Sequence, residues 1–414
     1  MRRMKHFLKP KHFALGFISG CALLITSAPA IAQTLTLTSA STNDDWWAIA
    51  CSSDGTKLTA VAFDDGFGDG GSIFISTNSA GTWTPTLAPS TVSWQSVASS
   101  VDGTKLLAAD FEDANNNPGL LYVSTNSGKT WKAPSAPSNF WYCVACSGDG
   151  SRMFAADSGD GDGLIYVSTN FGKTWNATRA PPDAWAGIAC SSTGLKVVAA
   201  DSGFGDALIY TSQDAGAIWD PTSAPTNQWA CVASSADGTK LLAADSGYGD
   251  ELIYTSSDSG TSWSPTGAPT NQWAAVACSS DATKLFAADS GYGDQLVYAS
   301  SDSGTNWTPL AGALEYWTSL AVSADGSKLA AAAAPGGIFT LQQNPLLTIL
   351  PAGGTALISW PESAPGFVLQ QSPNLITLQW VTVTNVPVVT NEINQVSVPL
   401  PPVASQFFRL RSTN

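Results

Sequence analysis

The sequence of 414 residues has few of the residues that several functions require. Its only two histidines, His6 and His12, lie close to the N-terminus, and no cluster of cysteine and histidine suggests a zinc site. Charged residues make up only 12 %, with a formal net charge of −14. Because binding to a phosphate backbone needs a basic surface, this balance argues against nucleic acid and equally against polyanionic glycans.

The N-terminal region contains the one long apolar segment of the sequence. Basic residues up to Lys11 precede the apolar stretch 13–25, and Ala30-x-Ala32 offers a cleavage site before Gln33. Residues 1–32 are therefore expected to be a signal peptide of a secreted or periplasmic protein. An alternative is a lipobox at 18–21, which would make Cys21 a lipid anchor. No later segment reaches the roughly 20 apolar residues that span a bilayer.

Tryptophan recurs at a regular spacing through most of the chain. A motif of Trp, two residues, a hydrophobic residue and Ala precedes a turn and a basic residue, at intervals of 47, 47, 44, 44, 44 and 44 residues. We number these motifs from Trp47, Trp94, Trp141, Trp185, Trp229, Trp273 and Trp317.

Between these motifs lie turns of the type Ser-x-(Asn or Asp)-x-Gly-x-x-Trp. Their side-chain oxygens are expected to accept backbone N–H groups within the turn, and their Gly to adopt positive φ. The polar residues at the third position are Asn78, Asn126, Asn170, Asp214, Asp258 and Asp302. We interpret all six as structural.

Each period contains four strand signals separated by turns, and helical periodicity is absent. Four antiparallel strands in 40 to 50 residues are typical of a propeller blade. The seventh period supplies only three strands, and the stretch 34–41 before the first Trp motif has the spacing of the missing fourth. The sequence therefore predicts an all-β fold, with a seven-bladed β-propeller over residues 33–343 that the N-terminal strand closes.

The six turns resemble the BNR or Asp-box repeats of sialidases, xyloglucan-type glycosidases, sortilin-like receptors and photosystem II assembly-factor-like propellers. The resemblance covers about 310 residues, and it implies a propeller with these turns on the side away from the active site. It does not imply one function. Asn replaces the family's Asp at Asn78, Asn126 and Asn170.

Residues 344–414 differ in composition, because the Trp repeat stops and Pro, Val and Leu become frequent. Six short strand signals predict a small β-sandwich of fibronectin type. Its role cannot be inferred from the sequence.

Six cysteines remain after removal of a signal peptide. We interpret them as small apolar residues in a tight core, with disulfides between neighbouring blades as the alternative. They are Cys51, Cys143, Cys146, Cys190, Cys231 and Cys278.

In propeller topology, the loops between the second and third strands share one face with the loops that lead into each first strand. We call this the mouth face, and it is acidic in six blades. The loop acids are expected either to accept turn N–H groups or to bind a cation. The best calcium candidate is the loop with Asp157, Asp160 and Asp162, because carboxylates and carbonyls are ligands that Ca²⁺ prefers. No other cofactor is predicted.

The mouth face should also carry aromatic residues outside the Trp repeat. Aromatic rings beside amides and carboxylates suit stacking and hydrogen bonding to neutral sugars. The candidate ligand-binding residues are Trp46, Phe140, Phe204, Tyr248, Tyr292, Tyr316, Asn227 and Asn271.

Catalysis by this face would need one carboxylate made different from its neighbours by its environment. The acids that depart from the repeat are Glu112, Asp113, Asp183, Glu251 and Glu315. Sialidases need an arginine cluster for the substrate carboxylate, and the propeller contains only Arg152 and Arg179. Sialidase activity is therefore not expected.

Three functions fit these observations. The first is a secreted, non-enzymatic and monomeric propeller that binds a neutral glycan or an extracellular protein at its mouth. The second is a glycoside hydrolase that uses two carboxylates of the same face, which requires them to be about 5 to 10 Å apart. The third is an assembly or receptor scaffold that acts by protein–protein contact.

Overall fold

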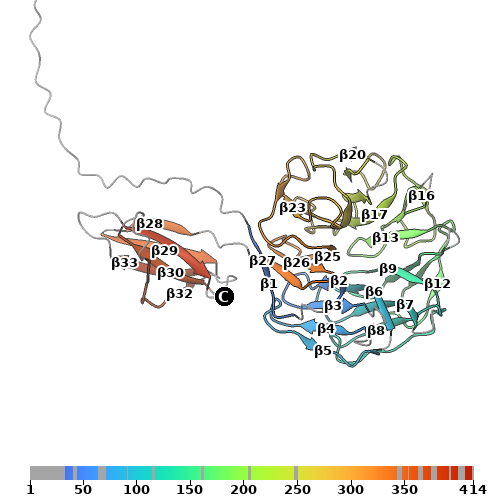
Figure 1. The fold of residues 1–414 in the computed structure, drawn as a ribbon, viewed down its shortest axis with the longest axis horizontal. Coiled ribbons are helices and arrows are strands. Elements are labelled where there is room, and N and C mark those ends of the chain that lie inside the picture. Colours follow the sequence, from blue (N-terminus) through green and yellow to red (C-terminus); the bar gives the residue numbers. More distant parts are fainter. Residues whose placement is uncertain are drawn as a thin grey trace, which may run out of the picture. The chain divides into compact units, whose positions relative to one another are not determined.

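The structure is a computed structural model, and the regular elements in its described residues are all β-strands, β1 to β34 (Figure 1). The predicted all-β class is confirmed. Among the described residues, no helix is long and apolar enough to cross a membrane. The described ranges are 33–40, 44–63, 71–90, 92–113, 117–159, 163–203, 207–246, 250–342, 347–352, 354–361, 367–373, 380–390, 393–399 and 406–412.

The fifth repeat shows how one sequence period becomes one sheet. Strands β17 (Trp229–Ser234), β18 (Leu241–Asp245), β19 (Ile253–Ser256) and β20 (Ser264–Pro265) pair in chain order and antiparallel. Every residue of β18 is buried, because neighbouring sheets cover both of its faces. The outermost strand has only two exposed residues and ends at Pro265, which cannot donate to a further strand and so protects the edge.

The other repeats form equivalent sheets. In the second sheet, a single bridge between Val123 and Lys132 takes the place of a fourth strand. From the innermost strand outwards, the sheets are β2 (Trp46–Cys51), β3 (Leu58–Ala62), β4 (Ile73–Ser76) and β5 (Thr84–Pro85); β6 (Val92–Ser99), β7 (Leu106–Asp113) and β8 (Leu121–Ser124); β9 (Trp141–Cys146), β10 (Met153–Asp157), β11 (Ile165–Ser168) and β12 (Asn176–Ala177); β13 (Trp185–Cys190), β14 (Val197–Asp201), β15 (Ile209–Ser212) and β16 (Asp220–Pro221); β21 (Trp273–Cys278), β22 (Leu285–Asp289), β23 (Val297–Ser300) and β24 (Thr308–Pro309); and β25 (Trp317–Val322), β26 (Lys328–Ala333) and β27 (Ile338–Gln342).

The sheets within residues 35–342 form a closed ring (Figure 1). Each innermost strand packs against that of the next sheet, in the order β2, β6, β9, β13, β17, β21 and β25, and β25 packs against β2. Strand β1 (Leu35–Leu37) pairs with β27 through Leu35 opposite Leu341. The N-terminal strand therefore completes the last sheet, as predicted.

A circle of backbone hydrogen bonds connects each sheet of this ring to the next. In each turn between the first and second strands, one residue donates its N–H to the carbonyl of the equivalent residue in the next sheet, at 2.7 to 2.9 Å. Because the bonds use backbone groups, the circle imposes little on the side chains of its members. They are Ser53, Val101, Gly148, Ser192, Ala236, Ser280 and Ala324, whose N–H returns to Ser53.

The repeat tryptophans form the core of each blade. All seven are at most 1 % exposed. Each meets an aromatic ring from the third strand of its own sheet, edge to face, with ring centroids 5.1 to 5.8 Å apart, an arrangement that aromatic quadrupoles favour. The pairs are Trp46–Phe74, Trp94–Tyr122, Trp141–Tyr166, Trp185–Tyr210, Trp229–Tyr254, Trp273–Tyr298 and Trp317–Phe339.

The first member of this set corrects the sequence interpretation. Trp46 occupies the repeat position, opposite Ala62 in β3, and is fully buried. Trp46 is therefore a core residue and does not contact a ligand. Trp47 is half-buried and packs against Phe63, with centroids 5.2 Å apart. The adjacent tryptophans could not be told apart by spacing, because the early intervals are irregular.

The six Asp-box turns lie between the third and fourth strands. In each, Oδ1 of the polar residue accepts the backbone N–H four residues later, at 2.8 to 3.0 Å, and a hydroxyl of the preceding Ser at 2.8 to 3.0 Å. Ala80 occupies the Gly position in the first turn, with φ of 68°. The residues are Asn78, Asn126, Asn170, Asp214, Asp258 and Asp302.

The six cysteines of the propeller are half-buried free thiols. Burial raises the pKa of Cys51, Cys190, Cys231 and Cys278 to about 12. Cys143 and Cys146 are three residues apart on β9, where alternation places their side chains on opposite faces. The interpretation of these thiols as packing residues agrees with this geometry.

The C-terminal strands form two sheets. A single apolar cluster draws buried residues from both, including Ile358, Trp360 and Val396 from one sheet and Leu369 from the other. Packing of two sheets through one core is a β-sandwich, as predicted. The first sheet joins β28 (Thr348–Ala352), β29 (Thr355–Pro361), β33 (Ile393–Pro399) and β32 (Val388–Thr390); the second joins β31 (Val381–Thr382), β30 (Phe367–Ser372) and β34 (Phe407–Ser412).

Candidate functional site

Backbone hydrogen bonds divide the loops of each blade between two faces. On the mouth face, the residue after the second strand donates to the loop that leads into the first strand, as Ser246 does to Gln228 at 2.8 Å. On the other side, which we call the back face, the Asp box donates to the turn between the first and second strands, as Ser259 does to Thr239 at 2.8 Å. The chain therefore separates its two sets of acids as the topology predicted.

The first acid of each mouth loop is structural in five blades. Each lies in the second strand opposite the repeat Trp, and four of the five are at most 3 % exposed. The strand ends at this Asp in four blades and continues to Asp113 in the second blade. Each accepts at least one backbone N–H at 2.7 to 3.1 Å, which offsets the cost of burying a carboxylate. They are Asp110, Asp157, Asp201, Asp245 and Asp289.

The second acid of the loop is exposed but has partners on its own face. Asp250 accepts a hydrogen bond from Asn227 Nδ2 at 3.0 Å and a short one from the hydroxyl of Tyr254. Burial, followed by the hydrogen bond to Asp250, raises the pKa of Tyr254 to about 12. In the next blade Asp294, Asn271 and Tyr298 repeat this arrangement. Asn227 and Asn271, predicted to bind ligand, thus order the loop acids.

Asp183 breaks this pattern. It occupies the position of Asn227 and Asn271, two residues before the repeat Trp, but its carboxyl is hydrogen-bonded to that of Asp201. Burial, and then the neighbouring Asp183, raise the pKa of Asp201 to about 7, against the lowering effect of the Gly203 N–H at 2.7 Å. Contact with Asp183 therefore helps the carboxyl group of Asp201 to retain its proton to a higher pH than an ordinary aspartate does.

Glu315 is the equivalent residue of the last blade and has a different environment. Its blade carries Ala333 opposite the repeat Trp, where five other blades carry an Asp. Partial burial raises the pKa of Glu315. The adjacent Tyr316 is 46 % exposed and faces Tyr292, which is 81 % exposed, with ring centroids 6.5 Å apart and planes at 78°. The mouth face thus carries an exposed aromatic pair, and Glu315 precedes Tyr316 in the chain.

The remaining candidates do not converge on this pair. Phe140 packs against Phe111 with centroids 5.4 Å apart. Glu112 is half-buried in β7, and Asp113 ends the same strand opposite Val92.

Glu251 has a positive φ of 59° and uses its backbone at three points. Its N–H donates to Asp245 at 3.0 Å, and its carbonyl accepts the indole N–H of Trp273 at 3.0 Å and the N–H of Asn271 at 3.2 Å. Glu251 therefore contributes to the loop through its main chain.

Four predicted residues lie outside the described residues. They are Phe204, Tyr248, Asp160 and Asp162. Asp157, the described member of the calcium candidate, accepts the Gly159 N–H at 3.1 Å. The calcium site stays a prediction.

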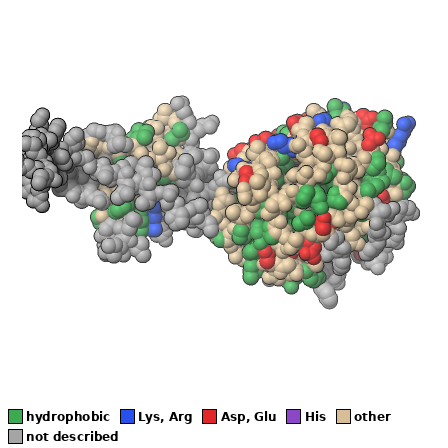
Figure 2. All heavy atoms as spheres, turned by 90° about the horizontal axis from the view of Figure 1, so that it is seen from above, with side chains coloured by type: hydrophobic (Ala, Val, Ile, Leu, Met, Phe, Trp, Pro, Cys, Tyr) green, Lys and Arg blue, Asp and Glu red, His purple; other side chains and the backbone are tan. Residues whose placement is uncertain are grey.

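On the side of the propeller seen in Figure 2, Asp and Glu side chains are more common than Lys and Arg. Arg152, one of the two arginines of the propeller, lies on the back face, where its Nη1 donates a hydrogen bond to the Thr193 carbonyl at 3.0 Å.

Comparisons with known proteins agree on the fold. Residues 165–178 match the family model described as the BNR-Asp box repeat. The structure is similar to the GH74 xyloglucanase from Xanthomonas campestris, with a TM-score of 0.59 at 14 % identity, covering 80 % of this chain and 60 % of that one.

Two further similar structures are matched by this chain over nearly their whole length. YCF48 from Cyanidioschyzon merolae gives a TM-score of 0.56 at 15 % identity, with 75 % of this chain and 99 % of that chain covered. YCF48 bound to D1 peptide gives 0.55 at 14 %, with 77 % and 100 % covered. None of the curated protein sequences matches this chain. At these identities the likeness shows the fold alone.

Proposed function

Because this chain is a BNR-type β-propeller, we propose that it is a secreted, non-enzymatic binding protein whose mouth face holds a neutral glycan or an extracellular protein. The observation that carries the proposal is the exposed pair of Tyr292 and Tyr316 beside Glu315. Large aromatic side chains are usually buried, so two that face solvent side by side favour a binding surface.

The chemistry around this pair suits a ligand with apolar faces and hydrogen-bonding groups. The ring of Tyr292 presents an exposed surface for stacking on a sugar or on a side chain of a protein. Glu315 adds an acceptor, and Asp294 lies exposed in the loop that carries Tyr292. A protein ligand would carry Lys or Arg at this point, because the surrounding surface is acidic.

The geometry of the carboxylates argues against the hydrolase alternative. A glycosidase needs two carboxyl groups about 5 Å apart or more, so that a sugar or a water fits between them. The pair with the raised pKa, Asp183 and Asp201, is within hydrogen-bond distance. The other first-position loop acids already hold backbone N–H groups. Catalysis would need two available carboxyl groups at a suitable distance, whereas ligand binding does not.

The test compares ligand binding by the wild type and by Tyr292→Ala and Tyr316→Ala variants. A glycan array of neutral polysaccharides and a library of peptides with and without Lys and Arg separate the two ligand classes. We expect each substitution to weaken binding about tenfold, which is about 1.4 kcal/mol and within the range for a contact at the centre of a binding surface. Ile218→Ala is the control, since Ile218 is 59 % exposed in the Asp box of the back face.

The result also decides between the functions. Retained binding in both tyrosine variants would place the ligand elsewhere and refute the role of this pair. Release of reducing sugar from a neutral polysaccharide, lost on substitution of a mouth carboxylate, would establish a hydrolase instead. Capture of peptides without any glycan signal would favour the scaffold function.

A further inference from the structure

A groove of about 340 Å³ lies on the back face, between the fifth and sixth sheets. Among its described lining residues, Lys240 carries the only charge. Apolar side chains include Leu241, Leu242 and Leu285. Hydroxyl groups come from Thr255, Ser257, Ser262, Ser264 and Ser303.

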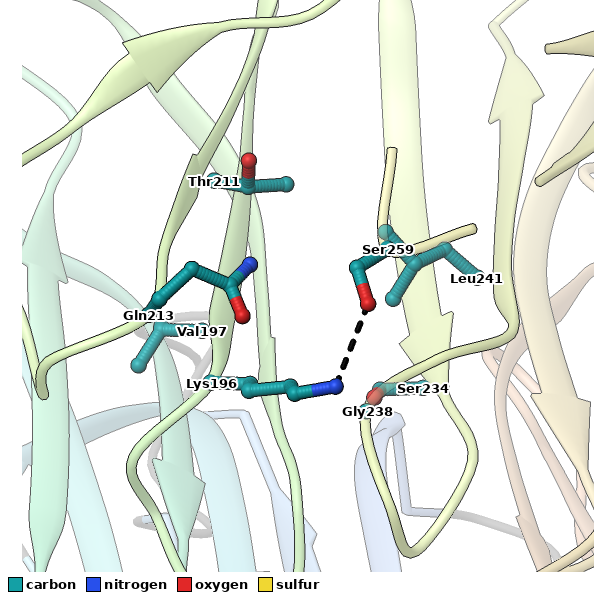
Figure 3. A pocket seen from close by; sticks show the side chains of 8 residues that line it. All are labelled: Lys196, Val197, Thr211, Gln213, Ser234, Gly238, Leu241 and Ser259. Carbon is teal, nitrogen blue, oxygen red and sulfur yellow. Dashed lines mark hydrogen bonds between the residues drawn. The ribbon is translucent and has the colours of Figure 1, made fainter. Parts of the chain in front are cut away.

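The equivalent groove between the fourth and fifth sheets is closed (Figure 3). Its eight lining residues all have counterparts 44 positions later in the open groove. In the closed groove Lys196 extends across the gap and donates to Ser259 Oγ at 3.2 Å, and Gln213 points into the space that remains. No room for a water molecule is left in this groove.

Two differences open the groove between the fifth and sixth sheets. Ser257 replaces Gln213, which removes a long side chain from the space. Lys240 does not cross to Ser303, the counterpart of Ser259. It donates instead to the Asp281 carbonyl, at 2.8 Å. The repeat thus produces the same architecture twice, with space for a ligand in one copy.

The lining selects the chemistry of the ligand. Hydroxyl groups both donate and accept, and an ammonium group has three donors, of which the bond to Asp281 uses one. The ionised carboxylate of Asp258 lies directly behind the wall, where it accepts from Ser262 Oγ at 2.6 Å. That charge disfavours an anionic ligand. A small ring with several hydroxyl groups fits this lining of hydroxyl groups and one ammonium group, whereas the leucines of the lining are at most 5 % exposed.

We propose that the groove between the fifth and sixth sheets binds a single neutral sugar residue, as a second site separate from the mouth face. Its volume is at the lower end of the range for small-molecule sites, which matches one sugar ring and not a long oligosaccharide. Lys240 and the hydroxyl groups of the lining bind the hydroxyl groups of the sugar, and the affinity is in the millimolar range.

The test uses the full chain with D-glucose, D-galactose, D-mannose and D-xylose in saturation-transfer NMR and titration. Ser257→Gln restores the side chain of the closed groove, which the fold already accommodates 44 residues earlier. We expect this variant to lose saturation transfer and to bind at least about tenfold more weakly. Lys240→Met keeps the aliphatic stem and should weaken binding by a smaller factor.

Gln213→Ser is the matched control, because Lys196 still closes the other groove and binding should stay at the wild-type level. An unchanged melting temperature shows that each variant is folded. Absence of saturation transfer for all four sugars in the wild type would overturn the proposal, as would wild-type binding by both Ser257→Gln and Lys240→Met. Loss of the same sugar in the Tyr292→Ala variant would assign the binding to the mouth face and also overturn it.

Discussion

Replacing Asp183 by Asn should stabilise the protein at neutral and alkaline pH. Asp183 faces the buried Asp201, whereas the equivalent positions of the next two blades carry Asn227 and Asn271. The substitution therefore installs the side chain that the neighbouring blades use. It removes the negative charge that competes with Asp201 for a proton, and it offers an amide donor to the Asp201 carboxylate.

The size of the effect follows from the proton that the folded state retains. The pKa of Asp201 rises from 3.8 to about 7, so between these values the folded protein binds more protons than the unfolded chain. Stability must therefore fall as the pH rises through this window. At about 1.4 kcal/mol for each pKa unit, the whole rise corresponds to about 4 kcal/mol as an upper limit. Burial is the largest cause and persists in the variant, so we expect Asp183→Asn to recover about 1 to 2 kcal/mol at pH 8.

Urea unfolding followed by tryptophan fluorescence, at pH 4 and pH 8, measures this difference. The variant should gain stability at pH 8 and little at pH 4, which is near the ordinary pKa of 3.8 for Asp201 in the unfolded chain. The converse substitution Asn227→Asp places a carboxyl near Asp245 and removes the bond to Asp250, and it should lower the stability at pH 8. An equal shift of Asp183→Asn at both pH values, or a loss at pH 8, would show that Asp183 does not raise the pKa of Asp201.

Three further predictions concern the architecture. Asp258→Ala should lower the urea midpoint of unfolding, whereas Asp258→Asn should change it much less, because Asn78, Asn126 and Asn170 make the same turn bond; chemical denaturation of both variants checks this. Ala282→Gly should stabilise by about 1 kcal/mol, since Ala282 has φ of 49° where Gly238 and Gly326 stand in other blades, and a loss of stability would refute the strain. The six propeller cysteines should react slowly with a thiol reagent at pH 8 and fully in urea, because burial raises their pKa values; rapid reaction of the native protein would contradict their burial.

The regular elements of the propeller could be read from the sequence because each repeat carries its own local signals. The fifth period predicted four strands, and β17 to β20 lie where those signals are. The Asp-box turns could also be predicted from the sequence, because a turn depends on residues within a few positions of one another. The error at Trp46 arose where the local signal was ambiguous, because Trp46 and Trp47 both fit a strand and only the packing against Phe74 decides between them.

The roles of the residues on the mouth face were harder to predict from the sequence. Asn227 and Asn271 looked like free polar groups, but each donates to an acid 23 residues away in sequence. The two grooves differ at four of their eight equivalent positions, among them Ser257 in place of Gln213, and these differences acquire meaning only when the two grooves are compared.

By itself, the sequence determined the strand pattern, the turns and the ring, because these depend on hydrophobic period, glycine and side-chain oxygens acting over a few residues. The tertiary structure alone decided which carboxylates are satisfied, which carboxyl group has a raised pKa and which gap between sheets stays open. Those properties depend on atoms that adjacent strands and blades bring together, and two similar local motifs can differ in them completely.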